Sequence, residues 1–284
     1  MKYSTEIDTI SLQVDCKTME EQRNINFMII RTIREYNKIY IKQNSSRNEH
    51  EILFNNNRIA IIKIGKNPIY NELKNEFVTN YYVSVCFAGL KRYNLVLDNL
   101  SAECLKVTVG ILNTCDVDYK LTELDVCIDM DVPMQNILTI CTTKLPRTEY
   151  YPLNNSFYNG NSVYIEKILE NRLTYNSQRA YVYNKSKKEK LIFTLSRFEL
   201  KLQKSFFLNN DLIDFTTIIN ALDRYTVMYF IKTIEKDIVI EKYNSYSKVR
   251  KRDIDKMGLN RYRVKPDVFK IWNFLKYLKD YRLY

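Results

Sequence analysis

The chain has 284 residues, of which 45% are hydrophobic and 27% charged, with only five proline and five glycine residues. This composition predicts a chain that is folded throughout and long enough for one large or two modest domains. The 44 lysine and arginine residues exceed the 33 acidic residues, and the net charge of +11 favours a polyanionic partner such as nucleic acid. An AT-rich genome also produces such a composition, so charge alone does not identify the partner.

The cysteine and histidine content excludes several classes of site. The six cysteines form no C-x-x-C pair, which argues against zinc and against a disulfide framework and predicts thiols in a reducing compartment. The single histidine, His50, lies in a polar run read as a solvated loop and rules out Ser-His-Asp triads and paired-histidine nickases. No stretch reaches the roughly 20 apolar residues of a membrane span, so a cytoplasmic protein without a membrane partner is expected.

The N-terminal half is predicted to alternate strands and helices. In chain order these are a strand at 7–14, a helix at 18–36, a hairpin of strands 52–54 and 58–64, a strand at 81–87, a helix at 101–112, a strand at 121–130 and a helix at 132–143. The helices open on a capping box at Thr18, a cap at Ser101 and an entry through Pro133. The hairpin turns over Asn55–Asn57 and ends at Gly65–Pro68.

The C-terminal half begins with a predicted loop at 144–160. Three strands follow, at 162–165, 179–184 and 193–203, and their short connections predict antiparallel order. Helical spacing covers 212–239, in one helix or two, and then 268–278. The predicted fold class is α+β, with a central antiparallel sheet flanked by helices and a helical, basic C-terminal extension.

Three predicted strands each gather polar side chains on one face, because side chains on a strand alternate between faces. These residues are Glu123, Asp125, Asp129 and Asp131 in the segment 123–131, Tyr181 and Tyr183 on strand 179–184, and Arg197, Glu199 and Lys201 on strand 193–203. If the strands are neighbours, oxygen ligands for a divalent ion, hydroxyl nucleophiles and cations for a phosphate share one surface. A salt-bridged, solvated sheet face shows the same alternation, so the pattern leaves both interpretations open.

Several short motifs follow one another in a distinctive order. They are Ile7–Ser11, Val83–Leu90, Thr122–Asp129, Ser162–Ile165, Tyr183–Lys185 with Glu189, and Arg197–Glu199. Over residues 7–204 this order resembles the replication initiation factor family (Rep_trans), the rolling-circle initiators of small plasmids and related relaxases. Two residues depart from the family's pattern, since Glu123 stands where arginine is usual and Glu166 where glycine is common.

The resemblance implies a metal-dependent tyrosine DNA endonuclease and strand transferase. In that family the tyrosine of the Tyr-Asn-Lys box attacks a DNA phosphodiester, which leaves a 5′-phosphotyrosine link and a free 3′-hydroxyl that primes replication. The matching nucleophile is Tyr183, with Tyr181 in reserve. A phenol with a pKa near 10 is a poor nucleophile at neutral pH, so it needs activation.

The resemblance also implies the groups that would activate the phosphate. Asp129 and Glu199, with Asp125, would hold Mg²⁺ or Mn²⁺. Lys185 and Arg197 would neutralise the charge of the transition state.

The implied partner is origin DNA, single-stranded or cruciform, with a host helicase and a homodimer as further expectations. Residues 1–207 are expected to form the nicking domain and 208–284 a helical, basic C-terminal region. The cations of that region that would bind DNA phosphates are Lys248, Arg250, Lys251, Arg252, Arg261, Arg263 and Lys265. A solvated helix flank explains them equally well.

Three other interpretations stay open. A non-catalytic DNA-binding protein on the same fold is favoured by Glu123 and Glu166. A relaxase of a mobile element shares the chemistry of an initiator. A structural or partner-binding protein would owe its basic charge to composition alone.

Overall fold

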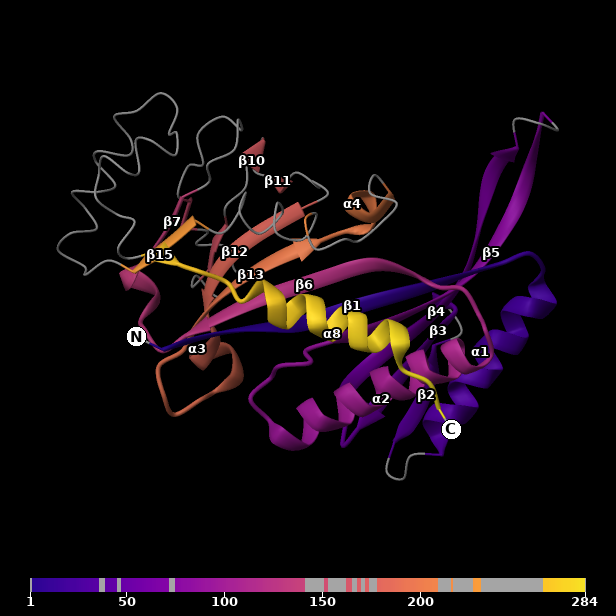
Figure 1. Cartoon of the computed structure of the whole chain (residues 1–284), viewed down its shortest axis with the longest axis horizontal. Helices are drawn as coiled ribbons and strands as arrows, with labels where there is room; N and C mark the ends of the chain where they lie inside the picture. Colours follow the sequence, from indigo (N-terminus) through magenta and orange to yellow (C-terminus); the bar gives the residue numbers. More distant parts are fainter. Residues whose placement is uncertain are drawn as a thin grey trace. The chain divides into compact units, whose positions relative to one another are not determined.

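The computed structural model describes residues 2–35, 39–44, 47–71, 75–140, 151–152, 162–164, 168–169, 172–173, 178–208, 216, 227–230 and 263–283. The chain forms two compact units. Unit 1 comprises Met1–Glu6 with Asp125–Trp272, and unit 2 comprises Ile7–Leu124 with Asn273–Tyr284. Antiparallel strands and helices make an α+β fold (Figure 1), which confirms the expected fold class. Neither unit begins or ends at residue 207, where the domain boundary was expected, and that boundary stays a prediction.

Strands β1 to β6 follow the order β2-β3-β4-β5-β1-β6. Their bounds are β1 Tyr3–Cys16, β2 Tyr40–Asn44, β3 Glu49–Phe54, β4 Asn57–Asn71, β5 Glu76–Ala88 and β6 Lys120–Met130. β1 belongs to unit 1 up to Glu6 and to unit 2 from Ile7, and β6 belongs to unit 2 up to Leu124 and to unit 1 from Asp125. The predicted strands at 7–14, 81–87 and 121–130 are therefore present, each longer than expected at one end or both.

A tight turn of two asparagines joins β3 to β4. Asn55 and Asn56 have φ values of 46° and 62°, the left-handed region that asparagine tolerates and that a two-residue hairpin turn requires. The predicted end of the hairpin at Gly65–Pro68 is wrong, because β4 continues to Asn71 in register with β5. A Cβ at Gly65 would lie 2.3 Å from the Tyr82 ring, so this glycine marks a close cross-strand approach within the strand.

His50 lies in β3, opposite Gln43 and Ile62, and the predicted solvated loop at this position is wrong. Asn44 ends β2, the outermost strand of the sheet, and Glu49 and His50 begin β3, so the polar run includes the ends of two neighbouring strands. Burial, with the charge of Arg34 adding to it, lowers the pKa of the His50 imidazole below its usual value.

Helices α1 (Met19–Arg34) and α2 (Leu95–Thr114) pack against each other and against β4. The Thr18 hydroxyl accepts from the Glu21 amide at 3.1 Å, which confirms the predicted cap. The predicted cap at Ser101 is wrong, because Asn94 caps α2 by accepting from the Leu97 amide at 3.2 Å. Ser101 is fully buried within α2, and the helix begins almost two turns before it, at Leu95.

The core of unit 2 lies between these helices and the strands they cover. Inward-facing side chains alternate along the strands, and those of α1 recur at helical spacing. The buried set includes Ile10, Leu12, Val14, Val83, Val85, Phe87, Ile25, Ile29, Ile33, Leu105, Val109 and Leu112.

Strands of unit 1 continue in the order β6-β13-β12-β9-β8. Their bounds are β8 Tyr151–Pro152, β9 Ser162–Tyr164, β12 Gln178–Asn184 and β13 Ser196–Leu202. The pairings β12–β13 and β12–β9 are antiparallel, which confirms the three predicted strands and their order. β10 (Ile168–Leu169) and β11 (Arg172–Leu173) pair with each other as a separate two-stranded antiparallel sheet.

A second sheet, in the order β15-β14-β7, corrects two predicted helices. Pro133 leads into one 3-10 turn, Met134–Asn136, and then β7, Ile137–Ile140, so the helix predicted at 132–143 is wrong. Val227–Phe230 forms β14 inside the segment predicted as helical, and Arg263–Val264 forms β15. β7 and β14 are rich in β-branched and aromatic residues that favour strands, and each needs its distant partner to pair. The remainder of 212–239, apart from residue 216, lies outside the described residues.

Three further helices are α3 (Lys185–Glu189), α4 (Lys204–Leu208) and α8 (Val268–Asp280). α8 confirms the helix predicted at 268–278. Within the described residues, no helix is both long enough and apolar enough to cross a bilayer.

Asn113, at the end of α2, holds the C-terminal end of α8. Its side-chain amide donates to the carbonyl oxygens of Leu278, Lys279 and Tyr281, at 3.1, 3.1 and 2.6 Å. The last carbonyl groups of a helix lack partners within the helix, so one amide here satisfies several of them.

Replacing Asn113 by alanine should lower the free energy of unfolding by about 1–3 kcal/mol, because partly buried carbonyl groups lose their donor. Urea unfolding followed by circular dichroism measures the change. The matched control is Asn99→Ala, an exposed asparagine on the same helix, which should leave the unfolding curve in place. Equal curves for the two variants would contradict a clamping role.

Candidate functional site

The polar face predicted for three strands is formed by neighbouring strands of unit 1. β13 lies between β6 and β12. In the register of β12 and β13, Tyr181 is opposite Glu199 and Tyr183 is opposite Arg197. Directly opposite residues of an antiparallel pair point to the same face, so these side chains meet. The other face of β13 carries the buried side chains Phe198, Leu200 and Leu202.

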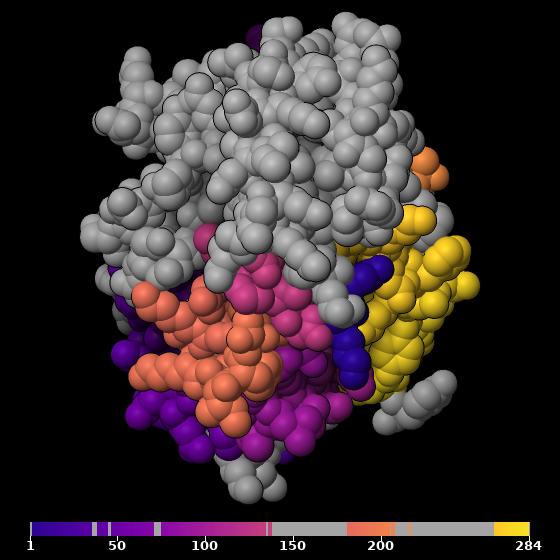
Figure 2. Space-filling model, turned by 90° about the vertical axis from the view of Figure 1, so that its left-hand side faces the viewer, coloured from indigo at the N-terminus to yellow at the C-terminus, as the bar shows by residue number. Residues whose placement is uncertain are grey.

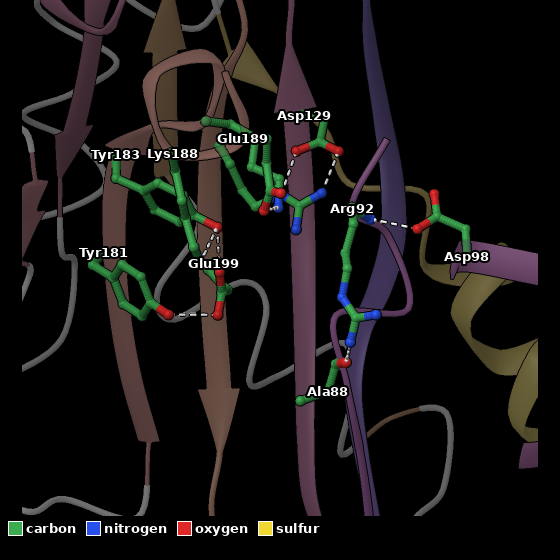
Figure 3. Close-up of polar contacts among 11 residues, drawn as sticks. Ala88, Arg92, Asp98, Asp129, Tyr181, Tyr183, Lys188, Glu189 and Glu199 are labelled. Carbon is green, nitrogen blue, oxygen red and sulfur yellow. Dashed lines mark hydrogen bonds and ion pairs between the residues drawn. The ribbon is translucent and has the colours of Figure 1, made fainter. Parts of the chain in front are cut away.

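One carboxylate binds both phenols (Figure 3). The Tyr181 hydroxyl donates to Glu199 Oε1 at 2.5 Å, and the Tyr183 hydroxyl donates to Glu199 Oε2 at 3.0 Å. The two rings stack with their centroids 5.6 Å apart. Tyr183 is only 5% exposed and Glu199 only 3%. The two hydroxyls are therefore fixed by a single acid at a site largely withdrawn from water.

Lys188 is a cation in contact with the Tyr183 hydroxyl. Its ammonium lies 3.5 Å from that oxygen and 4.8 Å from the centroid of the ring. The lysine comes from α3, which starts directly after β12 because the Asn184 side chain accepts from the Lys187 amide at 2.9 Å. Sequence reasoning missed Lys188, although the asparagine cap after Tyr183 was a signal that the chain turns back toward the strand's end.

The acids of β6 are paired with cations of β13. Arg197 donates through two nitrogens to the two oxygens of Asp129, at 2.6 and 2.8 Å, and both side chains are buried. Lys201 donates to Asp125 at 2.6 Å. As residue numbers rise along β6 they fall along β13, so the two strands run antiparallel.

Lys185 is also buried against an acid. Its ammonium lies 2.9 Å from Glu189, one turn along α3, and the residue is 1% exposed. Lys185 and Arg197 therefore each bind a neighbouring carboxylate inside unit 1. Their expected action on a transition state stays a prediction.

Burial, followed by the nearby charge of Glu199 and its hydrogen bond, raises the pKa of the Tyr181 hydroxyl well above its ordinary value. Ionising this phenol would place a second negative charge beside the carboxylate that it binds. Tyr181 is therefore held in its protonated form and acts as a hydrogen-bond donor.

The three carboxylates expected to bind Mg²⁺ or Mn²⁺ do not present a shared set of ligands. Asp129 is bound by Arg197, Asp125 by Lys201, and Glu199 by two phenols. Within the ranges that the structure describes, no group of three Cys, His, Asp or Glu side chains is placed to hold a metal ion. The donor set does not fit a divalent ion in this arrangement.

Most of the cations expected to bind DNA lie outside the described residues. These are Lys248, Arg250, Lys251, Arg252 and Arg261. Arg263 belongs to β15 and Lys265 is exposed just after it. Of the two departures from the family's pattern, Glu166 lies outside the described residues and Glu123 accepts from the Ser11 hydroxyl at 3.3 Å.

No protein-family model and no curated protein matches this sequence. Among solved structures, the chain is similar to the rolling circle replication initiator protein from Geobacillus stearothermophilus, with a TM-score of 0.42 and 11% sequence identity. The match covers 100% of this chain and 99% of that chain. A similarity of this size assigns neither a family nor an activity, so membership of the Rep_trans family stays a prediction.

Asp129→Asn should lower the free energy of unfolding by about 3–5 kcal/mol, because it leaves the buried Arg197 guanidinium without its counter-charge. The double variant Asp129→Leu with Arg197→Met removes both charges and should recover most of that loss. Urea unfolding measures both. Asp118→Asn, at an exposed acid, is the control. A single variant no less stable than this control would show that the ion pair does not hold the strands.

Tyr181→Phe should make the melting temperature depend less on pH in the alkaline range. Because the folded-state pKa is raised, this phenol's contribution is fully present below the unfolded pKa of about 10 and is lost as pH rises above it. The melting temperatures of the wild type and the variant should therefore converge above about pH 10. Tyr40→Phe, at a phenol that is 64% exposed, should run parallel to the wild type. A constant difference for Tyr181→Phe at all pH values would contradict the raised pKa.

Proposed function

We propose that this protein is a DNA strand-transfer enzyme of the rolling-circle replication initiator kind, with Tyr183 as its nucleophile. The observation that carries the proposal is the Glu199 carboxylate bound to the hydroxyls of Tyr181 and Tyr183 at once. A buried carboxylate in contact with a phenol is placed to accept its proton, which is how a weak hydroxyl nucleophile is activated. The net charge of +11 supports a polyanionic substrate.

The reaction transfers a phosphoryl group from the 3′ oxygen of DNA to the Tyr183 oxygen, and it moves the proton of the Tyr183 hydroxyl. The Tyr183 oxygen attacks the phosphorus of a DNA phosphodiester as its proton moves to Glu199 Oε2. The bond from phosphorus to the 3′ oxygen breaks, and the departing oxygen takes a proton from solvent water to become a 3′-hydroxyl. The 5′ end stays attached to Tyr183 as a phosphodiester of tyrosine. Attack by a 3′-hydroxyl on this link reverses each step and reseals the strand.

Lys188 supplies the positive charge for this step. Its ammonium is 3.5 Å from the Tyr183 oxygen, where it stabilises the phenolate as the proton leaves. The same position lets it neutralise an oxygen of the attacked phosphate. Lys185 and Arg197 stay with their own carboxylates and support the fold of the site.

Tyr181 is a positioning residue in this proposal. Its hydrogen bond fixes Oε1 of Glu199, which directs the second oxygen toward Tyr183. The raised pKa of Tyr181 keeps it protonated while Tyr183 reacts. The two tyrosines thus have different roles, although the sequence presents them as a pair.

The alternative is a non-catalytic DNA-binding protein on the same fold. It is favoured by the burial of Tyr183, because a nucleophile that is 5% exposed must become accessible before a phosphate can reach it. In that case the two phenols only bury and satisfy the Glu199 carboxylate. The proposed roles of Mg²⁺ or Mn²⁺, a host helicase and a homodimer are separate from the phenol chemistry, and no step above depends on them.

A covalent adduct assay tests the proposal. Labelled single-stranded DNA tiled across the gene for this chain and its flanks is incubated with the protein, and adducts are resolved on a denaturing gel. The wild type should form an adduct, and Tyr183→Phe should form none while still binding DNA. Glu199→Gln should slow adduct formation by about 10²- to 10⁴-fold, the range for a lost general base. Tyr181→Phe should be slower than the wild type and still form the adduct.

The controls separate chemistry from folding. Tyr40→Phe changes an exposed phenol and should react as the wild type does. Parallel reactions with Mg²⁺, with Mn²⁺ and with a chelator show whether the step needs a divalent ion. DNA binding without any adduct under all these conditions would reject the enzyme in favour of the non-catalytic alternative. An adduct that survives in Tyr183→Phe would reject Tyr183 as the nucleophile.

A further inference from the structure

The loop between α3 and β13, residues 190–195, presents apolar side chains to solvent. Ile192 is 103% exposed and Phe193 is 48% exposed. The part of the chain that contains α3 and this loop reaches the molecular surface (Figure 2). Apolar side chains scattered singly over a surface are ordinary, whereas these two are adjacent in the chain and both exposed.

The loop is closed at its base, so its tip is held in place. Ser186 and Leu195 pair across the base: the Ser186 amide donates to the Leu195 carbonyl at 3.1 Å, and the Leu195 amide donates to the Ser186 hydroxyl at 2.5 Å. The Leu191 amide donates to the Ser186 carbonyl at 2.9 Å. These bonds fix both ends of the loop and leave only Ile192, Phe193 and Thr194 as the projecting part.

Three lysines precede the tip of the loop, in α3 and at its C-terminal end. Lys187, Lys188 and Lys190 are exposed, and the one acid among them, Glu189, is bound by the buried Lys185. The exposed charge is therefore positive. Because Lys188 also contacts the Tyr183 hydroxyl, the same short segment connects the proposed nucleophile to the apolar tip.

We propose that the α3–β13 loop is a DNA contact that holds unpaired bases next to the proposed nucleophile. Ile192 and Phe193 pack against base faces, and Lys187 and Lys190 bind the flanking phosphates. Apolar side chains that insert beside bases are a recurring means of unstacking them, and an aromatic ring accepts any base. The inference rests on the proposed function in taking DNA as the ligand and Tyr183 as the neighbouring nucleophile, and its binding test does not require Tyr183 to react.

Charge complementarity favours DNA over a protein partner as the occupant. A strand of DNA offers alternating anionic phosphates and flat apolar bases, which match lysines beside an apolar tip. A protein surface would have to bring a cluster of acids to meet the same lysines.

Fluorescence anisotropy with a labelled oligothymidine of about 20 nucleotides tests the loop, because such a probe spans one or more binding sites. Ile192→Ser with Phe193→Ser should weaken binding by about five- to a hundred-fold, the cost of losing base stacking. Lys187→Ser with Lys190→Ser should reduce the slope of log affinity against log salt by roughly 1.4, or about 0.7 for each lost phosphate contact. The full chain is used throughout.

Phe77→Ser is the matched control, since Phe77 is an aromatic side chain that is 73% exposed on β5. It should bind the probe as the wild type does, and a melting curve of each variant shows that it is folded at the temperature of the assay. Wild-type affinity in the Ile192/Phe193 variant would overturn the inference and assign the tip to a protein partner. An equal loss in Phe77→Ser would also overturn it, because the effect would then follow from any exposed apolar residue.

The outcome is distinguishable from that of the adduct assay. Tyr183→Phe should bind the probe with wild-type affinity, because the nucleophile is not needed for binding. Loop-dependent binding without any adduct would support the inference while rejecting the proposed catalysis. An adduct formed by a protein whose binding ignores the loop would reject the inference alone.

Discussion

The arrangement of unit 1 depends on the buried ion pair of Asp129 with Arg197. A charge removed from water must be paired, so the guanidinium and the carboxylate fix β6 and β13 against each other. A slip of one residue would turn every side chain of β13 to the other face and bring Phe198 to the polar side. Glu199, two residues along the same strand, therefore faces the tyrosines of β12 as a consequence of where Arg197 is held. The ion pair sets the geometry of the site without taking part in its chemistry.

The charges on this face divide into two groups. Asp125, Asp129 and Glu189 are bound by Lys201, Arg197 and Lys185, and these pairs make the surroundings nearly neutral. Glu199 is instead bound mainly by phenol hydroxyls, with the Lys201 ammonium 3.8 Å away. Of these carboxylates, Glu199 is the one in hydrogen-bond contact with the Tyr183 hydroxyl. In the proposed reaction the proton therefore passes to Glu199, and the cation beside Tyr183 is Lys188 of α3.

The sequence predicted those parts of the fold in which local pattern and final environment agree. Alternation placed Tyr181 with Tyr183 and Asp125 with Asp129, and the structure brings the three strands together. Local pattern failed where a distant partner decides: β7 and β14 pair with each other across about 90 residues, so Ile137–Ile140 becomes a strand in a segment that reads as a helix. Gly65 and Ser101 misled because glycine and serine often mark boundaries, whereas here one lies under Tyr82 and the other is buried within α2. Lys188 could not be assigned from spacing, because its position depends on the turn that follows Asn184.

Two strands, β1 and β6, each contribute residues to both compact units. Genetic dissection of this protein is constrained accordingly, since a truncation at either strand leaves a broken ladder and exposes an edge whose amide and carbonyl groups have lost their mates. Fragments cut within either strand would therefore be expected to aggregate through that edge, so biochemical work on either unit needs the whole chain.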